Sequence, residues 1–183
     1  RDAAILAIGA LGDGRTVPVL ARALTRAETE AERQKVEVAL VRLQGEEETD
    51  RAIVAQLRAR TPEPKHYLVS ALARRGGSQA RPVLLTEAGS PDPKVARAAF
   101  QGLGQLATAE DLPTLLENLV ELKAAGIRTE AEEAVARTLA RVDDPAVRSR
   151  AVTVQLSQSR DPEVRRSLIR LLPVCGDNAS LAA

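Results

Sequence analysis

His66 and Cys175 are the only imidazole and the only thiol in this chain of 183 residues. Metal centres and nucleophilic dyads are usually built from several such groups, so any site that needs two imidazoles is excluded. No histidine lies near Cys175 in the sequence to activate its thiol. We therefore predict that His66 is a solvent-exposed side chain and that Cys175 is a buried, unreactive thiol.

The charged clusters have simple structural interpretations. The acidic run GEEETD at residues 45–50 could bind a cation, or its carboxylates could lie at the positive end of a helix dipole. The second interpretation is favoured, because the run directly precedes an apolar helical segment. Asp143 and Asp144 likewise predict a turn and a helix cap. We expect no metal site and no cofactor.

Composition excludes further classes of function. The 26 basic and 25 acidic residues give a net charge of +1, so no overall field attracts nucleic acid or an anionic membrane. Tyr67 and Phe100 are the only aromatic residues, which removes platforms for stacking bases. No apolar run is long enough to span a bilayer. We expect a soluble protein that binds neither nucleic acid nor a membrane; a lone cysteine favours the cytoplasm, with the periplasm as the alternative.

The chain repeats itself. The segment AAFQGLGQLATAEDLPTLLENL at residues 98–119 aligns without a gap on AAILAIGALGDGRTVPVLARAL at residues 3–24. Pro18, Pro82 and Pro113 recur at one place in this pattern, and the first interval between them is about twice the second, so it holds two units. Cys175 aligns with Leu11 and Leu106 in the same pattern, and these positions are predicted to face the core. We predict one array with units at approximately residues 1–25, 26–60, 61–90, 91–125, 126–160 and 161–183.

Each unit is predicted to contain two amphipathic helices. Apolar residues recur at helical spacing, and the second helix of the fourth unit carries them at Leu112, Leu115, Leu116 and Leu119. The three repeated prolines fall in the first turn of second helices, where a missing N–H is tolerated. Three aspartates that precede proline predict helix N-caps: Asp92, Asp144 and Asp161. Glycines inside first helices, Gly9 and Gly104 among them, predict close approach of a neighbouring helix.

Phrases such as DPKVARAAFQGLGQLATAEDLPTLL and DPEVRRSLIRLLPVCGD resemble the short bacterial HEAT unit of the phycobilisome-lyase type. In that unit an Asp-Pro start, a central arginine, an Ala-rich first helix ending in LG and a GD turn recur. The resemblance implies an all-α fold, a right-handed α-α superhelix (solenoid) of about six helical hairpins. Arg75 and Pro173 depart from the pattern, which predicts locally irregular packing. The arginines that follow Asp-Pro are predicted to pair with turn carboxylates between stacked units: Arg97, Arg148 and Arg165.

The resemblance covers proteins of many functions, including chromophore lyases and DNA-repair enzymes. This chain has no tryptophan and too few aromatic residues to line a chromophore pocket, so we predict that it is not an enzyme. We expect a scaffold that binds a protein or peptide on its concave face, formed by second helices. The alternative is a structural or regulatory appendage of a larger enzyme. Because the chain begins with Arg1 and lacks Met, we expect a segment of a longer protein, with uncapped ends that favour association.

The helical phase also predicts where a partner binds. If the leucines of the fourth unit face the core, the polar residues opposite them, and their equivalents in earlier units, face the concave side. These candidate partner-binding residues are Arg22, Arg26, Gln56, Glu87, Glu117, Asn118 and Glu121. Their charge runs from basic to acidic along the chain, so a bound segment is expected to be acidic at one end and basic at the other.

Overall fold

The computed structural model describes residues 2–58 and 65–176, which form eleven α-helices and three short 3-10 helices. No β-strand occurs among these residues, so the predicted all-α fold is confirmed for them. The chain divides into two compact units, Arg1–Glu87 (unit 1) and Ala88–Ala183 (unit 2). The grouping of all six repeats into one array stays a prediction, and the second helix expected in the sixth repeat lies outside the described residues.

The helices follow the predicted order of hairpins. Unit 1 holds α1 (Asp2–Leu11), α2 (Val17–Arg26), α3 (Glu30–Arg42), α4 (Glu46–Arg58), α5 (Lys65–Arg75) and α6 (Ala80–Ala88), which ends at the boundary. Unit 2 holds α7 (Pro93–Leu106), α8 (Leu112–Glu121), α9 (Arg128–Leu139), α10 (Pro145–Gln158) and α11 (Pro162–Cys175). The 3-10 helices are η1 (Gly14–Thr16), η2 (Ala109–Asp111) and η3 (Ala125–Ile127).

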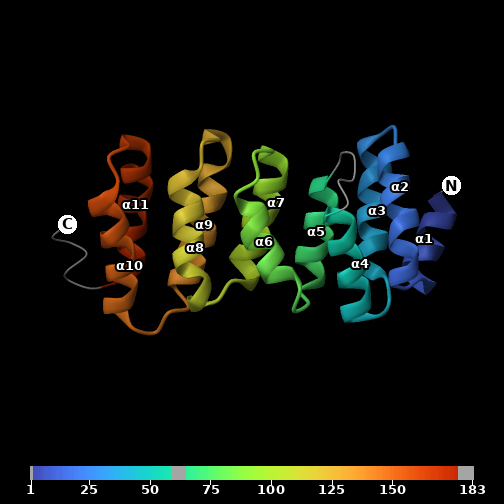
Figure 1. Ribbon diagram of the computed structural model, residues 1–183, viewed down its shortest axis with the longest axis horizontal. Helices are drawn as coiled ribbons and strands as arrows, with labels where there is room; N and C mark the ends of the chain where they lie inside the picture. The colour runs from blue at the N-terminus through green and yellow to red at the C-terminus, as the bar shows by residue number, and fades with distance from the viewer. Residues whose placement is uncertain (1, 59–64, 177–183) are drawn as a thin grey trace. The chain divides into compact units, whose positions relative to one another are not determined.

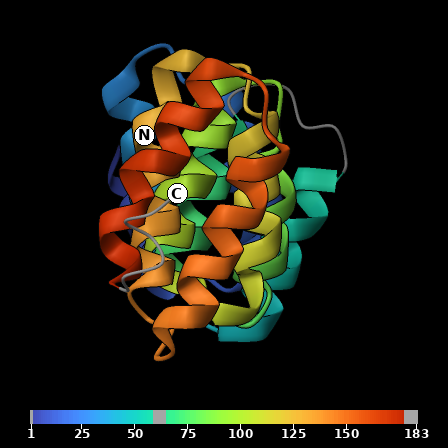
Figure 2. The same cartoon turned by 90° about the vertical axis from the view of Figure 1, so that its left-hand side faces the viewer.

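Each unit is built from two layers of helices (Figure 1). In unit 1 the first helices of successive hairpins pack on one another, α1 on α3 and α3 on α5, while the second helices α2 and α4 form the other layer. Unit 2 repeats this arrangement with α7, α9 and α11 in one layer and α8 and α10 in the other. Figure 2 shows α10 and α11 side by side at the C-terminal end. Stacked helical hairpins of this kind are the architecture of an α-solenoid.

Local sequence signals place the helix starts as predicted. Pro18 and Pro113 occupy the first turns of α2 and α8. The side chains of Asp92, Asp144 and Asp161 cap α7, α10 and α11 by accepting hydrogen bonds from backbone N–H groups of the first turn. Glu46 to Glu48 form the first turn of α4, which is the position that the helix-dipole interpretation of the acidic run requires.

The predicted core stripe of α8 is confirmed, because Leu112, Leu115, Leu116 and Leu119 are all buried. Burying one such leucine side chain stabilises a fold by roughly 1.5 to 3 kcal/mol. Leu11 was expected in the core but is 81% exposed. The buried residues Ile5 and Gly9 mark the side of α1 that faces α3, and Leu11 is rotated away from it.

Two glycines at matching positions have different reasons to be there. A Cβ atom on Gly9 would lie 2.7 Å from the Cα of Ala39, so α1 and α3 approach as closely as predicted. A Cβ atom on Gly104 would lie 3.4 Å from an Arg137 nitrogen and 3.7 Å from the Cα of Ala134. These are ordinary contact distances, so close approach does not require glycine at position 104.

Arg75 is buried and paired, so the prediction of local irregularity was wrong at this position. Its side chain is 6% exposed, and its Nε lies 2.5 Å from Oδ1 of Asp50, whose side chain is 2% exposed. The guanidinium also donates to main-chain carbonyls at the end of α3 and the start of α4, including Leu43 at 2.9 Å and Gly45 at 3.1 Å. One arginine on α5 therefore satisfies both a buried carboxylate on α4 and the carbonyls that α3 leaves unpaired.

Candidate protein-binding surface

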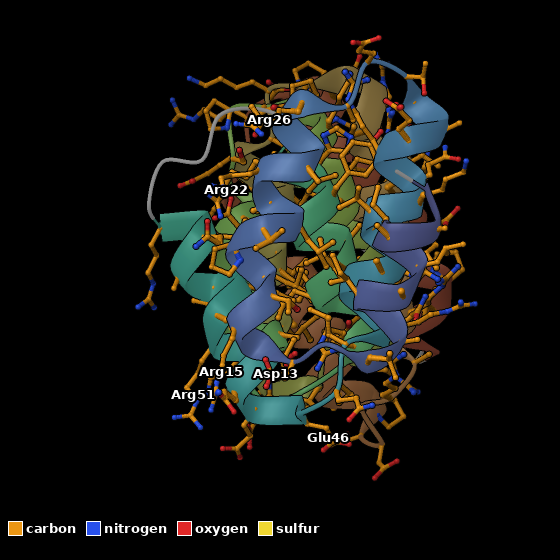
Figure 3. The ribbon with its side chains drawn as sticks, turned by 90° about the vertical axis from the view of Figure 1, so that its right-hand side faces the viewer. Asp13, Arg15, Arg22, Arg26, Glu46 and Arg51 are labelled. Atoms are coloured by element: carbon orange, nitrogen blue, oxygen red, sulfur yellow. The ribbon has the colours of Figure 1, made fainter. Side chains whose placement is uncertain are left out.

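The predicted basic end of the partner-binding surface lies on α2. Arg22 and Arg26 are exposed on this helix, and they project from the same side of unit 1 as Arg15 and Arg51 (Figure 3). Helical residues three and four apart share a face, so these two arginines are neighbours. Gln56, predicted to belong to the same partner-binding surface, lies on α4 and is half-buried.

Glu87 does not have the exposed position that was predicted for it. Its side chain is 12% exposed and forms an ion pair with Lys65, with 2.8 Å between Nζ and Oε2. The pair ties the end of α6 to the start of α5. Glu87 is thereby engaged within unit 1, which the helical phase alone did not reveal.

The predicted acidic end lies on α8 in unit 2. Glu117 and Glu121 are exposed and Asn118 is half-buried. Asn118 and Glu121 also line a shallow hollow whose other walls are residues 88–91 and 122–124. The outer side of α8 is therefore accessible to a partner and carries negative charge.

Three further arginines of unit 1, which the helical phase of α8 did not predict, are exposed on α4 and directly before α2. Arg15 is exposed on the 3-10 helix η1, directly before α2. Arg51 and Arg58 lie on the exposed stripe of α4, the helix that packs against α2. The sequence does contain a signal for two of them, because Arg51 and Arg58 are seven residues apart and so fall on one side of a helix.

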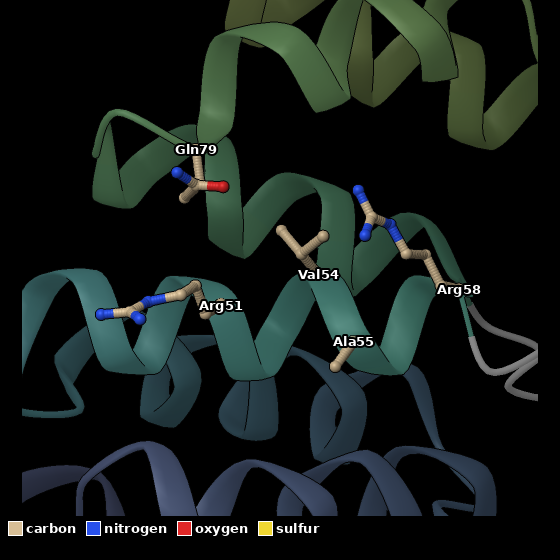
Figure 4. A pocket seen from close by; sticks show the side chains of 5 residues that line it. All are labelled: Arg51, Val54, Ala55, Arg58 and Gln79. Atoms are coloured by element: carbon tan, nitrogen blue, oxygen red, sulfur yellow. The ribbon is translucent and has the colours of Figure 1, made fainter.

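A hollow in unit 1 lies over this part of α4. Its lining residues are Arg51, Val54, Ala55, Arg58 and Gln79. Arg51 and Arg58 flank Val54 and Ala55 along α4, and Gln79 faces them from the turn before α6 (Figure 4). The hollow thus combines a small apolar floor with two cationic walls and one amide.

His66 is half-buried, so the prediction of a fully solvated histidine was wrong. Its ring lies 4.1 Å from the ring of Tyr67, measured between centroids. The Tyr67 hydroxyl donates a hydrogen bond to Glu30 on α3. Burial, together with this contact to a carboxylate, raises the pKa of Tyr67 to about 12. The same hydrogen bond holds the pKa of Glu30 below its usual value.

Cys175 is fully buried, as predicted, and its Sγ lies 3.6 Å from the carbonyl oxygen of Leu171. Among residues 2–58 and 65–176, no group of three or more His, Cys, Asp or Glu side chains is arranged to hold a metal ion. Within the same residues, no helix is both long enough and apolar enough to cross a bilayer.

The predicted ladder of arginines and turn carboxylates is largely wrong. Arg97 on α7 does pair with a carboxylate, that of Glu130 on α9, at 2.8 Å. Arg148 and Arg165 instead donate to main-chain carbonyls, those of Cys175 and Leu156, at 3.0 and 2.7 Å. The reason is that an Asp-Pro start marks helices of both layers: α7 and α11 belong to one and α10 to the other.

Comparison with known protein families supports the repeat interpretation. The family model described as HEAT repeats matches residues 50–136. A second model, described as PBS lyase HEAT-like repeat, matches residues 1–26. A search of curated proteins gives no match to this chain. The two family matches agree with the stacked helical hairpins of both units, and they identify HEAT repeats at residues 1–26 and 50–136.

Proposed function

We propose that this chain is a scaffold that binds an extended segment of a partner protein along its second helices. HEAT repeats generally mediate protein–protein interactions and are typically not catalytic. The observation that carries the proposal is the charge on two second helices, where Arg22 and Arg26 on α2 and Glu117 and Glu121 on α8 are all exposed.

These charges suggest a polarised partner. The segment carries acidic residues where it lies on α2 and basic residues where it lies on α8. Exposed charges of this kind act mainly on the association rate and on the orientation of the partner, because solvent screens their contribution to affinity. Within each unit, the layer of second helices is the binding face in this proposal.

Short peptides selected from a random display library on the immobilised chain supply a ligand for the test. Binding kinetics are then compared for the chain, for R22E/R26E and for E117K/E121K. We expect either reversal to slow association by about tenfold, equivalent to about 1.4 kcal/mol in the barrier. Replacing the acidic residues of the peptide with basic ones should restore the rate for R22E/R26E, and replacing its basic residues with acidic ones should restore it for E117K/E121K.

The control is R137E/R166E, which reverses two exposed arginines on first helices. Each is paired with an exposed glutamate of its own helix. Arg141, another exposed arginine that follows α9, is not used in the control variant, because its side chain donates hydrogen bonds to the carbonyls of Gly104 and Ala107, both at 2.8 Å. The proposal is wrong if the library yields no binding peptide, or if the control slows association and both second-helix reversals leave it unchanged.

A further inference from the structure

The hollow over α4 in unit 1 contains features of an anchoring site. Arg51 and Arg58 lie seven residues apart on α4, with the exposed Ala55 and the buried Val54 between them in the sequence. Gln79 supplies an amide from the opposite wall. An apolar floor between two guanidinium groups suits a short uncharged side chain with carboxylates on either side.

The surroundings of the hollow strengthen its positive charge. The adjoining helix α2 adds Arg22 and Arg26, and η1 before it adds Arg15, all exposed. Glu47 shares the α4 stripe and lies 3.6 Å from Arg51, but both side chains are mostly exposed, at 74% and 66%. Such a pair in water holds its partner weakly, so Arg51 can exchange Glu47 for an incoming carboxylate.

The chemistry favours an acidic protein segment over a nucleic acid. Both aromatic residues of the chain, Tyr67 and Phe100, are buried, so neither can stack on a base. The carboxylates of Glu46, Glu47 and Glu48 occupy the start of α4 and would repel a continuous phosphate backbone. A peptide with separate carboxylates can place each one away from this cluster.

We propose that this hollow anchors an extended acidic segment of the partner protein, with two carboxylates about three residues apart. The inference rests on the proposed scaffold function and names the partner chemistry at one place on it. Seven helical residues rise by about 10 Å. A segment in the polyproline II conformation covers that length in about three residues, and because this conformation has three residues per turn, side chains three residues apart lie on the same side. One carboxylate then meets Arg51, the next meets Arg58, and a small residue between them lies on Ala55.

Three fluorescein-labelled peptides test the anchor: a Gly-Ser peptide with a central Glu-Ala-Ala-Glu, its Gln-Ala-Ala-Gln counterpart, and one with the two glutamates adjacent. We expect the spaced glutamates to bind most tightly, as measured by fluorescence anisotropy. R51S/R58S should weaken this binding about tenfold, whereas the matched surface pair R137S/R166S should leave it unchanged. The single variant A55E, at an exposed helical position, should also abolish binding.

The outcomes separate this inference from the scaffold proposal. If peptides selected from the library bind and depend on Arg22 and Arg26, yet R51S/R58S and A55E change nothing, the anchor is wrong and the scaffold stands. If no peptide of any charge binds, the scaffold itself is wrong. Duplex DNA that binds more tightly than the spaced glutamates, and is released by R51S/R58S, would overturn the choice of an acidic protein segment.

Discussion

Replacing Arg75 with methionine removes the group that neutralises Asp50 and satisfies the carbonyls between α3 and α4. The side chains of both residues are almost completely buried, at 6% and 2% exposed. Removing one member of a buried ion pair costs about 3 to 5 kcal/mol, because the remaining charge stays in a poorly solvated place. Replacing both, as D50N/R75M, should cost less than the sum of the two single changes, because that charge is then gone.

The neighbouring residue supplies the control. Arg74 pairs with Glu37 at 3.2 Å, but its side chain is 52% exposed, so replacing it with methionine should cost less than about 1 kcal/mol. Urea unfolding gives the free energies, and hydrogen exchange in α3 to α5 reports whether the loss is local to unit 1. Equal losses for the Arg74 and Arg75 variants, or additive losses at Asp50 and Arg75, would refute the reasoning.

Three other predictions follow from particular contacts. Tyr67 should titrate near pH 12 in the folded chain and about two units lower in urea; because its folded pKa is raised, its stabilising contribution is complete below about pH 10 and is lost as the pH rises towards 12. Ultraviolet absorbance reports it cleanly, since the chain has one tyrosine and no tryptophan, and a folded-state transition near pH 10 would contradict it. Gly9→Ala should destabilise the chain by about 1 to 3 kcal/mol, whereas Gly104→Ala should be neutral or stabilising by up to about 1 kcal/mol; thermal melts that rank them in the opposite order would refute the packing argument. Leu115→Ala should cost about 2 to 5 kcal/mol in urea unfolding, and a loss below about 0.5 kcal/mol would mean that the site is not core.

The helices and their caps were predictable because they depend on local chemistry. An aspartate before a proline caps a helix through its own backbone neighbours, so Asp92, Asp144 and Asp161 could be assigned from two adjacent letters. Likewise the leucine spacing of α8 needs only a helical period to identify its buried side.

The predictions that were wrong concern side chains whose surroundings depend on contacts between distant parts of the sequence. Arg75 looked like a defect because its partner, Asp50, lies 25 residues away. Leu11 was predicted to face the core because it aligns with Leu106 and Cys175. Those two residues are half-buried and buried, whereas Leu11 lies on the exposed side of α1. Glu87 looked exposed until Lys65, at the start of α5, was placed beside it. A repeat pattern predicts the fold of each unit, but it does not say which side chain fills each particular gap.

The most direct test of the scaffold proposal is to locate the bound peptide by photo-crosslinking. Benzoylphenylalanine is placed at Val19 or Thr114, which are exposed on the second helices α2 and α8, and at Glu133, which is exposed on the first helix α9. We expect a library-selected peptide to crosslink at Val19 and Thr114 and not at Glu133. Crosslinking at Glu133 alone would contradict the proposal.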